Sequence, residues 1–193
     1  MFKKVLQKIF NKENRAWIIG ISALLFILIL DIITKNLVNR YLEERVEVVV
    51  IPHLFNFLHI KNDGGAFGIG SNSPVGRIVF IVIPIVASGA LTFAMFKFGK
   101  KSIVLSLSLG LMVAGAIGNV IDRLAFNGEV TDFIRFAFWD NFGIFNVADI
   151  GVVVGVVLFA VYIIFLYKDE SKKDKNDKNS DDIDKTKEEE KIS

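Results

Sequence analysis

Four aspartates lie inside or beside the most apolar segments of this 193-residue chain. They are Asp31, Asp122, Asp132 and Asp149. Asp149 is the hardest to explain as an ordinary surface charge, because Val147 and Ala148 precede it and a long apolar run follows it. A carboxylate at the centre of a membrane-spanning helix costs about 2.5–3.5 kcal/mol on insertion scales, and less toward the edge. Such a residue therefore indicates a functional site.

Carboxylates that lie close together favour acid–base chemistry. Two of them cannot both ionise cheaply, so one keeps its proton near neutral pH while its partner is charged. The charged partner can take a proton from water, and the neutral one can donate to a carbonyl oxygen or a leaving amine. These two roles predict hydrolysis of an amide without a covalent intermediate.

Residues for other kinds of catalysis are absent or badly placed. The chain contains no cysteine, which excludes a thiol nucleophile, a thiolate metal site and a disulfide. His53 and His59 lie in a strand-like stretch and are interpreted as packing or interfacial residues. We therefore expect neither a metal ion nor a cofactor.

Four apolar segments must position the aspartates. They are residues 16–35, 76–98, 102–121 and 144–167, and each approaches or exceeds the roughly 18 residues that predict a spanning helix. A basic stretch precedes the first segment, as in a signal peptide, but no small-residue cleavage site follows, so we interpret this segment as a retained signal-anchor. The sequence predicts an all-α polytopic membrane protein with four transmembrane helices.

The two longer connections between the apolar segments have strand-like patterns. In residues 40–74, VEVVV and LFNFLHI are β-prone, with Pro52 between them. They predict a small extracytoplasmic β-rich element between the first and second helices, followed by the glycine-rich turn NDGGAFGIG. Residues 127–143 contain TDFIRFAFWDNF, which suits a short strand or an interfacial segment.

The distribution of basic residues indicates the orientation. With a cytoplasmic N-terminus, most of the 23 lysines and arginines fall in inner segments, and four spans return the C-terminus to the cytoplasm. Residues 1–15 are expected to form a basic cytoplasmic segment on the membrane surface, and residues 16–167 the membrane domain. Residues 168–193 are expected to be a disordered, charged cytoplasmic tail. The net charge of +2 indicates no nucleic-acid surface.

This topology places further polar residues at the depth of the aspartates, near the outer ends of the spans. They are Lys35, Asn62, Asn119, Arg123 and Asn146. Each has an ordinary alternative: a helix-end ion pair for Asp31 and Lys35, an N-cap for Asn146, a turn for Asn62, and interfacial or loop charges for Asp122, Arg123 and Asp132. Because separate segments deliver polar groups to one depth, we interpret them as one site.

Two other classes of protein were weighed against a hydrolase. A proton-coupled transporter or channel predicts polar residues along the whole membrane path and inverted repeats, and the sequence has neither. A structural membrane scaffold predicts no polar cluster at all. The grouping of polar residues near one face of the membrane favours an enzyme.

Five short blocks resemble the signature blocks of lipoprotein signal peptidase, also called signal peptidase II. In chain order they are DIITK (31–35), NDGGAF (62–67), GNVIDR (118–123), VTDF (130–133) and FNVAD (145–149). Thr131 stands where that family usually has a valine, and the stretch from Asp122 to Asp132 is one residue longer than usual. Both differences affect the expected path of the loop between Asp122 and Asp132.

The resemblance implies an aspartyl endopeptidase with Asp132 and Asp149 as its catalytic pair. The family's supporting or substrate-binding positions correspond to Asp31, Lys35, Asn62, Gly64, Asn119, Asp122, Arg123 and Asn146. The implied reaction removes signal peptides from prolipoproteins, with cleavage just before a cysteine that carries diacylglycerol.

The resemblance also implies the setting and the partners. They are the bacterial cytoplasmic membrane, with both termini cytoplasmic and the active site near the outer face, and diacylglyceryl-modified prolipoproteins and membrane lipid as partners. A monomer and inhibition by globomycin-type cyclic peptides are expected as well.

Overall fold

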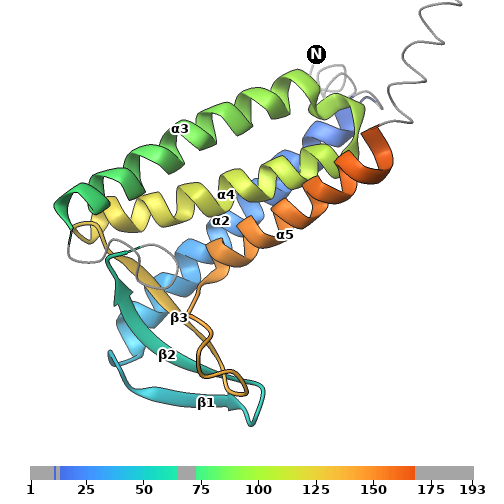
Figure 1. Cartoon of the computed structure of the whole chain (residues 1–193). Coiled ribbons are helices and arrows are strands. Elements are labelled where there is room, and N and C mark those ends of the chain that lie inside the picture. The colour runs from blue at the N-terminus through green and yellow to red at the C-terminus, as the bar shows by residue number, and fades with distance from the viewer. Residues whose placement is uncertain (1–10, 12–13, 65–72, 168–193) are drawn as a thin grey trace, which may run out of the picture.

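The structure is a computed structural model that describes residues 11, 14–64 and 73–167 (Figure 1). Most of the predicted N-terminal surface segment, part of the glycine-rich turn and the whole charged tail lie outside the described residues. The predictions for those segments therefore stay predictions.

Long helices make up most of the described chain. They are α2 (Arg15–Tyr41), α3 (Pro74–Phe98), α4 (Ile103–Ala125) and α5 (Val147–Val161), with the short turns η3 (Gly99–Lys101) before α4 and η4 (Tyr162–Leu166) after α5. Four helices of the described part are long and apolar enough to cross a membrane, so the predicted four-span architecture is confirmed. The first helix continues beyond its predicted end at Lys35, because the next residues are compatible with a helix and Val38 is buried against the protein.

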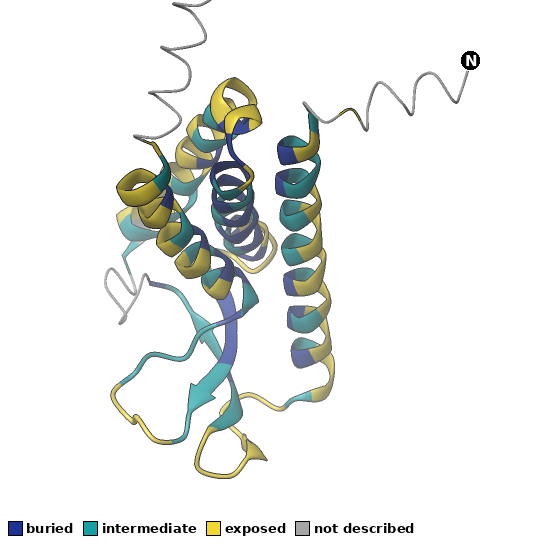
Figure 2. Cartoon of the chain, turned by 90° about the vertical axis from the view of Figure 1, so that its right-hand side faces the viewer, coloured by how far each residue is buried: buried dark blue, intermediate teal, exposed yellow. Residues whose placement is uncertain are grey.

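Helix α4 is the central helix of the bundle. In its most apolar window 56% of the residues are buried, against 17% in α2 and 11% in the second span, which begins in α3 (Figure 2). Small residues allow the neighbours to approach closely: a Cβ at Gly110 would collide with the backbone oxygen of Gly20 on α2, and one at Gly115 with that of Ala148 on α5. Close backbone approach at small residues is typical of helix packing in membranes.

The outward faces of the other three helices are apolar. Phe26 on α2 and Val153 on α5 are each more than three-fifths exposed, and so is Ile83 on α3. A contiguous apolar surface of this kind faces lipid in a membrane protein. The exposed side chains therefore agree with the architecture that helix length and composition indicate.

A small sheet lies at one end of the helices (Figure 1). It consists of β1 (Glu47–Ile51), β2 (Phe55–Asn62) and β3 (Val130–Phe136), antiparallel in the order β1-β2-β3. The prediction of a β-rich element after the first helix is confirmed. The sheet is completed by β3 from the second long connection, which pairs Asp132 with Ile60 of β2.

Candidate active site

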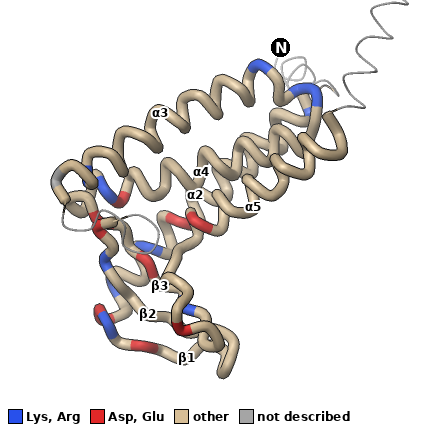
Figure 3. The backbone as a smooth tube through the Cα atoms, in the orientation of Figure 1, with Lys and Arg blue, Asp and Glu red and all other residues tan. Residues whose placement is uncertain are grey.

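Charged and amide residues of the sheet, the second half of α2, the end of α4 and the start of α5 come together. Figure 3 shows the charged positions among them as blue and red segments of the backbone. We call this group the polar cluster. Its members are Asp31, Lys35, Asn62, Gly64, Asn119, Asp122, Arg123, Asp132, Asn146 and Asp149. Hydrogen bonds and ion pairs join all ten predicted site residues into one network.

Asp132 is buried in the third position of β3, with only 2% of its surface exposed. Its carboxylate accepts hydrogen bonds from Asn62 Nδ2 at 2.9 Å and from Asn146 Nδ2 at 2.7 Å. Burial raises the pKa of Asp132 to about 7, with the charge of Asp149 adding to the effect, while the two amides and Lys35 oppose it. This carboxyl group can therefore hold a proton near neutral pH.

Asp149 lies in the first turn of α5, and its position is set by a capping box. Its backbone nitrogen donates to Asn146 Oδ1 at 3.0 Å, and its Oδ2 accepts from the backbone nitrogen of Asn146 at 3.1 Å. The other carboxylate oxygen, Oδ1, accepts from Asn119 Nδ2 on α4 at 2.8 Å. Helix capping thus explains why this carboxylate points back toward the sheet instead of along the helix.

Asn146 joins the two carboxylates. Its side chain caps the helix that carries Asp149 through Oδ1 and donates through Nδ2 to Asp132. The ordinary alternative for this residue, an N-cap, is correct, but the same amide also contacts the second carboxylate. One side chain therefore fixes both carboxylates relative to each other.

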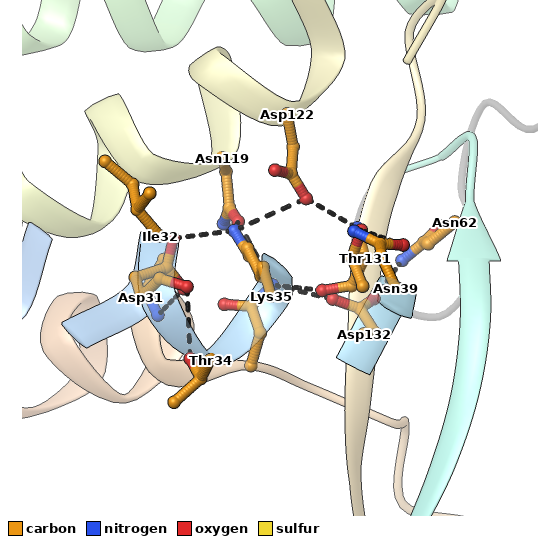
Figure 4. Close-up of polar contacts among 12 residues, drawn as sticks. Asp31, Ile32, Thr34, Lys35, Asn39, Asn62, Asn119, Asp122, Thr131 and Asp132 are labelled. Carbon is orange, nitrogen blue, oxygen red and sulfur yellow. Dashed lines mark hydrogen bonds and ion pairs between the residues drawn. The ribbon is translucent and has the colours of Figure 1, made fainter. Parts of the chain in front are cut away.

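Lys35 and Asp31 form a buried pair one helical turn apart on α2 (Figure 4). Lys35 Nζ lies 2.8 Å from Asp31 Oδ2 and donates to Asn119 Oδ1 at 2.9 Å. The other oxygen of Asp31 accepts from the backbone nitrogen of Ala148 at 2.9 Å, in the first turn of α5. The pair therefore connects α2 with α4 and with the start of α5. The ordinary alternative, an ion pair within one helix, accounts for only one of these contacts.

Asp122 connects the end of α4 to β3. Its Oδ2 accepts from the backbone nitrogen of Thr131 at 2.8 Å and lies 3.7 Å from Lys35 Nζ (Figure 4). The connecting loop turns through Asn127 and Gly128, whose φ angles of 53° and 97° are in the left-handed region that asparagine and glycine tolerate. This turn leads the chain from the end of α4 into β3.

Arg123 and Gly64 close the cluster on the side of the glycine-rich turn. Arg123 Nη2 donates to the carbonyl oxygen of Gly64 at 3.1 Å, and the Gly64 nitrogen donates to Asn62 Oδ1 at 3.0 Å. Asn62 thereby keeps its Nδ2 directed at Asp132. Asn62 therefore makes the local contact of a turn residue, as its ordinary interpretation held, and it is also a hydrogen-bond partner of Asp132.

Three polar residues next to the cluster were not predicted as site residues. Lys61 Nζ donates to Asn39 Oδ1 at 2.7 Å and to Thr131 Oγ1 at 2.8 Å, and it lies 3.8 Å from the centre of the Phe126 ring. Burial lowers the pKa of Lys61, although nearby carboxylates oppose the effect. Asn39 had a usable sequence signal, because it follows Lys35 at a spacing of four and so shares its helix face. Lys61 had no such sequence signal, because its contact with Thr131 arises only when β2 pairs with β3.

The histidines lie outside the network. His59 is buried and its Nδ1 lies 2.9 Å from the carbonyl oxygen of Leu42, so its interpretation as a packing residue is confirmed. His53 lies in the turn between β1 and β2 with a φ of 64°. No group of three or more potential metal ligands occurs among the described residues. Within the cluster, Asp132 and Asp149 are two hydrogen-bonded carboxylates with Lys35 nearby.

Comparisons with known proteins agree with one another. A family model described as "Signal peptidase (SPase) II" matches residues 23–165. A "Lipoprotein signal peptidase" of Geobacter metallireducens is 37% identical over 151 residues, which cover 77% of this chain and 90% of the relative. One of Staphylococcus aureus is 37% identical over 166 residues, 84% of this chain and 98% of the relative.

A solved structure is similar in fold as well as in sequence. It is titled "Bacterial membrane enzyme structure by the in meso method at 2.3 A resolution" and gives a TM-score of 0.68 at 32% identity, over 80% of this chain and 90% of that chain. The residues that the family model matches run from α2 into the last span and include the whole polar cluster.

Proposed function

The chain belongs to the signal peptidase II family, and from this we propose that it is an aspartyl endopeptidase of prolipoproteins with Asp132 and Asp149 as its catalytic pair. Members of this family are proteases that remove signal peptides from prolipoproteins. The observation that carries the aspartyl mechanism is the bridge between the two carboxylates: Asn146 donates to Asp132 at 2.7 Å and forms the capping box with Asp149.

The pair shares one proton in the resting state. The ionised carboxylate takes a proton from a water molecule as its oxygen attacks the scissile carbonyl carbon, and the protonated carboxyl group donates to the carbonyl oxygen. The carbon–nitrogen bond then breaks: the protonated carboxyl group gives its proton to the leaving amine, and one hydroxyl of the tetrahedral intermediate returns its proton to the other carboxylate. The pair thus ends with one shared proton, as it began. A pKa of about 7 for Asp132 suits this exchange, but the pair titrates jointly, so base and acid are not assigned to individual residues.

The other members of the polar cluster hold the pair in place. Asn62, Asn119 and Asn146 orient the carboxylates, and Asp31, Lys35 and Asp122 join α2, α4, α5 and β3 around them. Arg123 and Gly64 are proposed to contact substrate or to hold the turn beside it. Fixed hydrogen-bond donors around reacting groups lower the reorganisation that the reaction needs.

The substrate is proposed to be a prolipoprotein whose cysteine already carries diacylglycerol, with cleavage just before that cysteine. The cluster lies where the spans end, so a lipid-bearing substrate can enter sideways from the bilayer with its peptide at the level of the carboxylates. Globomycin-type cyclic peptides are proposed to compete for this site, and a monomer would suffice, since the whole network lies within one chain.

The membrane is proposed to be the bacterial cytoplasmic membrane, with both termini in the cytoplasm and the sheet and site near the outer face. Residues 16–167 form the peptidase domain in this proposal. Residues 1–15 are a cytoplasmic basic segment and residues 168–193 a cytoplasmic tail. The lysine and arginine distribution supports this orientation.

The test is incubation of the purified protein with a diacylglyceryl-modified prolipoprotein, followed by measurement of signal-peptide loss. Wild type should cleave the lipid-modified substrate and leave the unmodified precursor intact. Asp140→Asn is a matched control, because Asp140 is an exposed carboxylate that pairs with Arg135 on the sheet. If Asp132→Asn and Asp149→Asn cleave as well as Asp140→Asn, the proposed catalytic pair is wrong.

A further inference from the structure

We propose that a groove between α3 and α4 binds the phosphate of a membrane phospholipid, held by Arg77 and Arg123. The groove has a volume of about 240 Å³ and lies between the first turns of α3 and the last turns of α4. Apolar side chains, among them Ile78 and Leu124, line the rest of it. A groove with cationic groups and an apolar wall suits a ligand that has an anionic head and an acyl chain.

The guanidinium group of Arg77 has no counter-charge within the described part of the chain. That of Arg123 has the carboxylates of Asp132, Asp149 and Asp122 nearby, but it keeps an unused donor. The guanidinium group of Arg77 forms no salt bridge or hydrogen bond with the described residues, and its buried Nε has no acceptor. Arg123 is only 8% exposed and uses Nη2 for the Gly64 carbonyl, while its Nε is also without an acceptor. Buried donors without partners are uncommon in proteins and require an explanation. A phosphate supplies both the charge and the acceptor oxygens, which guanidinium groups bind in a bidentate manner.

The depth of the two arginines fits a phospholipid headgroup. Arg77 lies near the start of the span Val75–Lys101, and Arg123 near the end of the span Ile103–Ala125. Both spans end there on the side of the sheet, where Figure 3 shows basic residues on the two neighbouring helices. Basic pockets between transmembrane helices are known sites for anionic lipid headgroups.

The shape of the groove also depends on a glycine. Gly128 has a φ of 97°, and a Cβ there would come within 3.0 Å of Arg77 Cδ and 3.1 Å of its Cγ. The stem of Arg77 therefore lies against the bare backbone at Gly128. Next to the arginines in the groove lining, Ile78 and Leu124 are exposed by 62% and 65%, so an acyl chain can contact them.

Arg123 belongs to the polar cluster as well, so a bound lipid would neighbour the catalytic site without occupying it. The inference does not rest on the peptidase mechanism. It concerns a lipid other than the substrate, and its test measures binding and not cleavage. Failure of either proposal can therefore be distinguished from failure of the other.

The experiment measures the thermal unfolding midpoint of the full chain in a neutral detergent. Three additions are compared: phosphatidylglycerol, diacylglycerol with the same acyl chains, and inorganic phosphate. Phosphatidylglycerol should raise the midpoint of the wild type, and the other two should leave it unchanged. A rise with diacylglycerol of the same size would mean that the groove recognises only the chains, and a rise with phosphate alone would mean a free-anion site; either result overturns the proposal.

The variants are Arg77→Gln and Arg40→Gln. Arg40 is a matched control, because it lies in the last turn of α2 on the sheet side, over the ring of Tyr41. The rise with phosphatidylglycerol should disappear in Arg77→Gln and persist in Arg40→Gln, and equal rises in both would contradict the assignment.

If Arg77→Gln does not fold, lipids bound to the wild type and to Arg77→Lys are counted by native mass spectrometry instead. Arg77→Lys keeps the charge but loses the bidentate geometry, so it should retain less phosphatidylglycerol than the wild type. Retention of diacylglycerol and phosphatidylglycerol in equal amounts by the wild type would again overturn the proposal.

Discussion

The backbone nitrogen of Thr131 donates to Asp122 Oδ2 at 2.8 Å, which ties the start of β3 to the end of α4. The next residue along the strand is Asp132, whose side chain points toward Asn62 and Asn146. The carboxylate of Asp122 on the central helix α4 therefore holds the start of β3, the strand that carries Asp132. The position of one aspartate depends on another that does not itself need to react.

Asp122→Asn should disturb the position of β3 more than the chemical step of cleavage. The amide can still accept from Thr131, but it loses its charge next to Lys35 at 3.7 Å. A hydrogen bond to a charged acceptor is worth more than one to a neutral acceptor, so the free energy of unfolding should fall by about 1 kcal/mol. Folded yield, substrate affinity or both should fall, as measured by unfolding and by the KM for cleavage. Complete loss of turnover in well-folded protein would instead assign Asp122 to the catalytic pair.

Asp132→Asn and Asp149→Asn should each abolish turnover. Each variant keeps its shape and loses the titrating group, and general acid–base catalysis contributes about 10²–10⁴-fold. Both carboxylates act as one unit, so the double variant should be little worse than either single one. The measurement is cleavage rate per folded molecule, with Asp140→Asn as control. Additive losses in the double variant would contradict a shared mechanism.

Cleavage should decline as the pH rises through about 7. The pKa of Asp132 is raised to about 7, first by burial and then by Asp149, so the proton that the pair shares is present below this value and lost above it. The alkaline limb of the kcat/KM profile measures this loss. A profile that stays level through the alkaline range would contradict a shared proton on this pair.

Thr131→Val should cost stability and little activity. The substitution keeps the shape of the side chain and removes the hydroxyl that accepts from Lys61 Nζ at 2.8 Å and from Asn39 Nδ2 at 3.1 Å. Lys61 keeps its other acceptor on Asn39, so the loss should be about 0.5–1.5 kcal/mol in the free energy of unfolding. Thr34→Val is the control, since Thr34 donates only within α2. A large loss of cleavage at unchanged stability would assign the hydroxyl a direct part in the reaction.

The proposed orientation is tested with single cysteines in this cysteine-free chain. Asp140→Cys places a thiol at the sheet, and Lys100→Cys places one in η3 between α3 and α4. An impermeant thiol reagent added to intact cells should label the first and not the second, which should react only after the cells are opened. The opposite pattern would invert the topology.

The four spans could be predicted from the sequence because their signal is local. A helix in lipid satisfies its own backbone hydrogen bonds, so a sufficiently long apolar run determines it without reference to any other segment. The capping box at the start of α5 is equally local, since Asn146 and Asp149 are three residues apart. The predicted spans also gave the depth of each polar residue in the membrane. That depth was enough to group the aspartates with their polar neighbours.

The tertiary structure alone decided which side chains meet. The completion of the sheet by β3, the contact of Asn146 with Asp132 and the network of Lys61, Asn39 and Thr131 join segments that are far apart in the chain. Strand pairing and buried hydrogen bonds depend on register and on the direction of each side chain, and a shift of one residue turns a side chain to the opposite face of the sheet. Composition and local periodicity carry no information about that register, so only the folded chain establishes it.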